Sequence, residues 1–139
     1  MLIEVKTKVA RKIDGKVRKR TETYILDRDV FAEAEYRVLS SLSQEQELGM
    51  VEEFEIVSLK QSAVKELDVE SMDDALSSFM FSLRDLYLDD DGNEKQLKYK
   101  VLLWADNLTA ANQRALELSH QGYEMLIEGI KQVDYIYLL

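Results

Sequence analysis

The sequence predicts an α+β fold made of two hairpin–helix–strand (ββαβ) halves, with each helix packed on a largely antiparallel sheet. An Asp-Gly pair occurs twice, at positions 14–15 and 91–92, and runs of alternating apolar residues flank each pair. After each second run comes a segment with apolar residues at helical spacing, and then another alternating run. The order strand, strand, helix, strand in both halves is typical of α+β architecture.

The two halves align at a single offset of 77 residues, which is the spacing of the two Asp-Gly pairs. Residues 22–42 then lie over residues 99–119, and the matched pairs include Ala34 with Ala111 and Arg37 with Arg114. We therefore expect a single domain, residues 1–139, made of two pseudo-repeats at about 1–60 and 78–139 with a linker at 61–77. Two similar units that arose separately are the alternative.

In the first half, strands at 2–11 and 16–26 are expected to flank the turn at Asp14-Gly15. Asp-Gly is favoured in a type I′ turn because both central residues need a positive φ. A helix should follow, with Asp27 or Asp29 as its N-cap and Gly49 as its stop. The expected core stripe of this helix is Phe31, Ala34, Tyr36, Val38, Leu39 and Leu42. A short strand with Phe54, Ile56 and Ser58 on one face completes the half.

In the second half, strands are expected near 79–88 and 94–105. Asp106 or Asn107 should cap a helix that runs to about His120, where Gly122 ends it. A last strand is expected at 124–138. Its apolar residues change phase between Ile127 and Ile130, which predicts a β-bulge near Gly129.

Positive charge is concentrated in residues 8–20, KVARKIDGKVRKR, in a chain whose formal net charge is −9. Residues 1–20 hold eight basic and two acidic side chains, a net charge of +6. We predict that the hairpin is a contact arm roughly 30 Å long, about half of which projects into solvent. The candidate arm residues are Lys8, Arg11, Lys12, Lys16, Arg18, Lys19 and Arg20.

Three explanations of this charge stay open. Lys and Arg protect exposed edge strands against aggregation. A cationic arm also attracts acidic surfaces, so it could bind a neighbouring subunit or another acidic protein. The third explanation is nucleic acid, because a two-stranded ribbon fits the major groove. Against it, the arm has no aromatic residue for base stacking, and the rest of the chain is anionic.

The sequence favours neither catalysis nor a bound cofactor. It contains no cysteine and one histidine, and it lacks the usual phosphate-loop, dinucleotide, zinc-protease and nucleophile-elbow motifs. The acidic run at 89–94 fails as a calcium loop, because Tyr87 and Lys98 stand where the first and last ligands would be. We expect no enzyme activity, no metal and no cofactor. Without a long apolar run or a signal peptide, a cytoplasmic protein that does not contact a membrane is expected.

Residues 21–37, TETYILDRDVFAEAEYR, resemble an uncharacterised domain family of Bacteroidota bacteria and their phages. The residues that match its pattern are Thr21, Glu22, Tyr24, Asp27, Phe31, Glu33, Ala34, Glu35 and Arg37. Ala32 and Tyr36 depart from it. The resemblance implies a small bacterial or phage intracellular protein and transfers no catalytic residue.

These observations favour a non-enzymatic binding or assembly protein that uses the basic hairpin as its contact arm and that self-associates or binds an acidic protein. The alternative is a nucleic-acid accessory protein of phage or mobile-element replication. A weaker alternative is a phage sponge that sequesters a small anionic signalling nucleotide.

Overall fold

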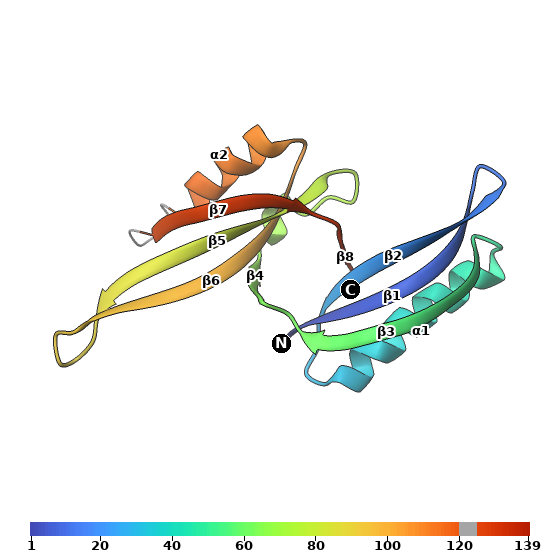
Figure 1. Cartoon of the computed structure of the whole chain (residues 1–139), viewed down its shortest axis with the longest axis horizontal. Coiled ribbons are helices and arrows are strands. Elements are labelled where there is room, and N and C mark those ends of the chain that lie inside the picture. Colours follow the sequence, from blue (N-terminus) through green and yellow to red (C-terminus); the bar gives the residue numbers. More distant parts are fainter. Residues whose placement is uncertain (120–124) are drawn as a thin grey trace. The chain divides into compact units, whose positions relative to one another are not determined.

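The computed structural model describes residues 1–119 and 125–139 (Figure 1). Within them it contains two α-helices, one short 3₁₀ helix and eight strands in two sheets, which confirms the α+β class. The chain divides into two compact units, Met1–Ser62 with Tyr135–Leu139 and Ala63–Asp134. His120 and Gly122, the expected end of the second helix, lie outside the described residues.

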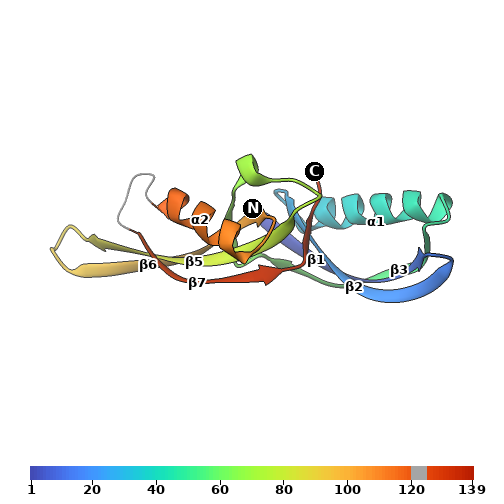
Figure 2. The same cartoon turned by 90° about the horizontal axis from the view of Figure 1, so that it is seen from above.

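Unit 1 is a four-stranded sheet with a helix on one face (Figure 2). Its central strand β1 (Leu2–Ile13) pairs antiparallel with both β2 (Lys16–Asp27) and β3 (Val51–Gln61). The short strand β8 (Tyr135–Tyr137) joins the far edge of β2, to which it runs parallel. The helix is α1 (Phe31–Glu47).

The core of unit 1 lies between α1 and the sheet. One row of α1 side chains, at every fourth residue, is buried: Ala34, Val38 and Leu42. They pack on the alternate strand residues Ile3, Val5, Val9, Tyr24 and Leu26. The expected stripe was too broad, since Tyr36 is 74% exposed. The expected N-cap was also wrong. The N-cap position is Val30, without a side-chain hydrogen bond, whereas Gly49 takes a positive φ just beyond the helix end as expected.

Unit 2 has the same construction. The central strand β5 (Ser77–Leu88) pairs antiparallel with β6 (Glu94–Ala105) and β7 (Met125–Val133), and β4 (Val64–Leu67) runs parallel to β6 on its far edge. The helix α2 (Leu108–Ser119) packs on this sheet through the buried Ala111 and Ala115. Asn107 caps it as expected, because its side-chain oxygen accepts a 2.8 Å hydrogen bond from the Ala110 amide. The 3₁₀ helix is Val69–Ser71.

The two sheets have the same strand order, and each contains a β-bulge. Their orders are β3-β1-β2-β8 and β7-β5-β6-β4. The register of β7 shifts between Ile127 and Gly129, which confirms the expected bulge. The register of β3 shifts at the corresponding point, between Ile56 and Ser58. The expected alternation of Phe54, Ile56 and Ser58 was therefore wrong, because the extra residue Val57 turns Leu59 toward the core instead. Duplication of one ancestral segment stays a prediction.

Both fourth strands were absent from the sequence-based expectation. The segment expected as a linker contains β4, and the single last strand expected at 124–138 divides into β7 and β8 around Asp134. The chain thus leaves unit 1 after Ser62, builds unit 2, and returns at Tyr135 to complete the sheet of unit 1.

Candidate binding surface on the first hairpin

The hairpin turn has the predicted geometry. Asp14 and Gly15 have φ values of 52° and 76°, so both occupy the left-handed region that a type I′ turn requires. The two-residue turn fixes the register, in which Val9 lies opposite Arg20 and Val5 opposite Tyr24.

The predicted projection of the outer half of the arm was wrong. The strand β3 is longer than expected and follows β1 as far as the pair Arg11–Val51. The amide of Lys12 donates a further 3.0 Å hydrogen bond to the carbonyl of Met50. Only residues 12–17 extend past this pairing, so most of the hairpin belongs to a three-stranded sheet and not to a free ribbon.

Arg11 differs from the other candidate arm residues because its guanidinium is bound inside unit 1. Nε and Nη2 donate to the two carboxylate oxygens of Glu22 at 2.6 and 2.8 Å, and Nη1 donates to Glu45 on α1. The hydroxyl of buried Tyr24 donates to Glu22 at 3.0 Å. Arg11 therefore fastens the end of α1 to the hairpin, and it is not available as a contact residue.

The pKa values in this cluster follow from its geometry. Burial alone would raise the pKa of Glu22, but the hydrogen bonds and charge of Arg11 outweigh burial and hold it below its ordinary value of 4.5. Burial and the Glu22 carboxylate raise the pKa of Tyr24, so its hydroxyl stays protonated. Glu22 is thus an anion and Tyr24 a neutral donor at neutral pH.

The other six arm residues, Lys8, Lys12, Lys16, Arg18, Lys19 and Arg20, are exposed. In the described part of the chain none of them forms an ion pair within 4.0 Å or a side-chain hydrogen bond. Arg20 acts on Glu22 through its charge alone. These six residues therefore present their cationic groups to solvent.

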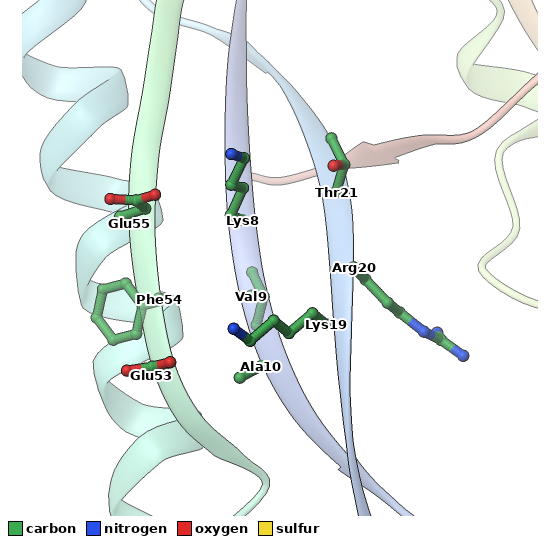
Figure 3. A pocket seen from close by; sticks show the side chains of 9 residues that line it. All are labelled: Lys8, Val9, Ala10, Lys19, Arg20, Thr21, Glu53, Phe54 and Glu55. Carbon is green, nitrogen blue, oxygen red and sulfur yellow. The ribbon is translucent and has the colours of Figure 1, made fainter.

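Three of the six lie on the sheet face away from α1. Lys8 and Lys19 point across this face, together with Glu53 and Glu55 of β3 (Figure 3). The four side chains border a shallow hollow of about 490 Å³, and Lys12 lies further along the same face. Because acids face bases across the hollow, this face carries little net charge.

The other three, Lys16, Arg18 and Arg20, share the α1 side of β2 with Tyr24 and Leu26, and they are not balanced in this way. The Arg20 side chain extends away from β1 and β3 (Figure 3). β8 pairs with β2 only at Thr23–Ile25, and no described strand pairs with this side of residues 16–22. Residues 16–22 therefore form an open strand edge that carries the side chains of Lys16, Arg18 and Arg20. We call it the cationic edge.

The charge of the two units differs. Unit 1 holds eleven basic and twelve acidic side chains, a net charge of −1. Unit 2 holds seven basic and fifteen acidic side chains, a net charge of −8. The cationic edge therefore contrasts strongly with the remainder of the chain.

The fold and this surface define an α+β protein with two hairpin–helix–strand units and a cationic strand edge. The chain belongs to the DUF4494 family, a domain of unknown function, whose model matches residues 2–136. No curated protein and no solved structure matches the chain. Within the described residues, no helix has the length and apolar character to cross a membrane, and no group of three or more His, Cys, Asp or Glu side chains could hold a metal ion.

Proposed function

We propose that this protein is a non-enzymatic binding protein whose contact arm is the first hairpin and whose partner is an acidic protein surface. The observation that carries the proposal is the group of exposed cations on the hairpin that lack an ion pair in the described chain. Exposed charges of one sign attract partners of the opposite sign and raise association rates. Arg11 is left out of the contact set, because Glu22 and Glu45 already occupy it.

An acidic protein is favoured over nucleic acid for two reasons. The hairpin is flanked by β3 over most of its length, so it lacks the free two-stranded ribbon that would enter a major groove. In addition, unit 2 with its net charge of −8 would repel phosphates, whereas a protein partner can place its acidic patch at the arm alone. The resemblance of residues 21–37 supports a cytoplasmic role in a bacterium or an infecting phage.

The test compares two variants with equal changes of charge. The arm variant carries Arg18→Glu, Lys19→Glu and Arg20→Glu. The control variant carries Lys65→Glu, Lys95→Glu and Lys131→Glu in unit 2. A labelled polyglutamate peptide should bind the wild type and the control, with an affinity that falls as salt is raised. The arm variant should bind at least about tenfold more weakly, because three attractions become repulsions.

The same samples separate the alternatives. A mass in light scattering above the 16.1 kDa monomer that falls in the arm variant identifies the acidic partner as a second copy. Binding of a DNA or RNA oligonucleotide in preference to polyglutamate contradicts the proposal in favour of nucleic acid. If no probe binds and the arm variant only aggregates faster, the cations serve edge protection, and the proposal fails.

A further inference from the structure

We infer that the cationic edge binds its partner by strand addition, and that the partner is an extended segment with acidic residues at alternate positions. This inference rests on the proposed function and names the chemistry of its ligand. In strand addition, backbone hydrogen bonds provide affinity and alternate side chains provide specificity. The cationic edge offers both.

The backbone part follows from the pairing of β8. The amide of Leu138 donates to the carbonyl of Ile25 at 3.1 Å, so the backbone groups of Ile25 face the β8 side of β2. Backbone groups of alternate residues point to the same side of a strand. Those of Val17, Lys19 and Thr21 therefore face the same way, beyond the end of β8, where no described strand receives them. An added strand would find these groups ready for pairing.

The side-chain part follows from the same alternation. Lys16, Arg18 and Arg20 lie two residues apart on one face, so they stand about 7 Å from one another along the strand. A neighbouring strand places its own alternate side chains beside them, and opposite charges across a strand pair are favourable. Three acidic residues at every second position match these cations, whereas three acidic residues in a continuous run would place at least one of them on the other face.

The charge also excludes the most common unwanted partner of an open edge, which is the same edge of another copy. Two such edges would place Lys and Arg rows side by side and repel each other. The corresponding edge of β6 provides an internal contrast. At the 77-residue offset its three positions are Asn93, Lys95 and Leu97, and Lys95 lies 4.0 Å from Asp89. Of these two corresponding edges, only that of β2 carries a row of three cations.

The test uses the full chain and three labelled peptides as long as residues 16–22. The first alternates Glu with Thr, the second has the same composition with its glutamates grouped, and the third is the first peptide with N-methyl groups on the amides that face β2. The alternating peptide should bind about tenfold more tightly than either of the others, because each of them loses matched charges or backbone hydrogen bonds. All these measurements use the wild type, so they do not depend on the folding of a variant.

The outcomes separate this inference from the proposed function. Equal binding of all three peptides, lost in the arm variant and kept in the unit 2 control, would refute strand addition and leave an electrostatic contact arm. Absence of binding by every peptide would overturn both. Infrared or NMR detection of an added strand with the alternating peptide supports the inference directly.

Discussion

At the residue scale, Arg11 shows why charge in a sequence does not equal charge on a surface. From the sequence alone, the seven Lys and Arg residues between positions 8 and 20 were equally good candidates for contact residues. Arg11 differs from the other six because its guanidinium binds Glu22 on β2 and Glu45 on α1. The register places Arg18 opposite Arg11 and Glu22 opposite Thr7, so strand pairing alone does not predict the contact between Arg11 and Glu22. The contact with Glu45 depends on where α1 lies, which no local pattern specifies.

This cluster makes a prediction that depends on pH. Arg11→Met should destabilise unit 1 by about 2 kcal/mol at pH 7, because it leaves the buried Glu22 carboxylate without its cation. In the wild type the pKa of Glu22 is lowered, so its stabilising effect is present above pH 4.5 and is lost as pH falls through the folded pKa. Without Arg11, burial should raise that pKa, and the gap between variant and wild type should narrow toward pH 4.

Hydrogen exchange of β1 and β2 amides measures this effect in unit 1, because the single tryptophan, Trp104, lies in β6 of unit 2. The matched control is Arg18→Met. Arg18 is paired with Arg11 across the hairpin but is exposed, so its loss should change stability by less than about 0.5 kcal/mol. Equal losses in the two variants would mean that the contacts of Arg11 contribute nothing.

At the element scale, the sequence predicted strands and turns well where residues that are neighbours in the chain determine them. The Asp-Gly turn and the change of apolar phase around Gly129 identified the hairpin and the bulge of β7. The same change of phase exists between Ile56 and Leu59, where no glycine marks it, and the bulge of β3 was missed. A phase change is therefore the more general signal, and glycine is only one of its markers.

The turn gives a prediction with a control elsewhere in the chain. A Cβ atom added at Gly15 or at Gly129 would meet no atom within 4 Å. The two glycines differ in backbone conformation, since only Gly15 has a φ in the left-handed region. Gly15→Ala should therefore cost about 1 kcal/mol from backbone strain alone, whereas Gly129→Ala should change stability by less than about 0.5 kcal/mol. Thermal unfolding of both variants checks this. A loss of stability in Gly129→Ala as large as that in Gly15→Ala would refute the explanation that the positive φ of Gly15 causes the loss.

At the scale of the whole molecule, the two fourth strands could not be read from the sequence. β8 has three residues and β4 has four, which is too short for a periodic signal, and each joins a sheet whose other strands are distant in the chain. The 77-residue offset did pair Arg37 with Arg114. Both arginines hold the residues just after a fourth strand. Arg37 Nε donates to the carbonyl of Leu139 at 2.7 Å, and Arg114 binds the Asp68 carboxylate at 2.7 and 2.9 Å.

Asp68 and Leu138 complete this correspondence, because their amides donate to Leu102 and Ile25, which are also 77 residues apart. The pKa of Asp68 shows the strength of its contact. Burial alone would raise it, but hydrogen bonds from Arg114 and Ser71 and the charge of Arg114 lower it below its ordinary value of 3.8. Each unit thus holds its fourth strand with an arginine from its own helix.

Deleting residues 135–139 tests whether β8 is an addition to a sheet that is otherwise complete. Thr23 and Ile25 direct their amides toward β8, whereas Tyr24 and Leu26 direct theirs toward β1. Hydrogen-exchange protection should therefore fall by about tenfold or more at Thr23 and Ile25 and persist at Tyr24 and Leu26. The amides of β6 are the control, since β4 stays in place beside them. A uniform loss across β2 would instead show that unit 1 requires β8 to fold, and that the returning segment is part of its core.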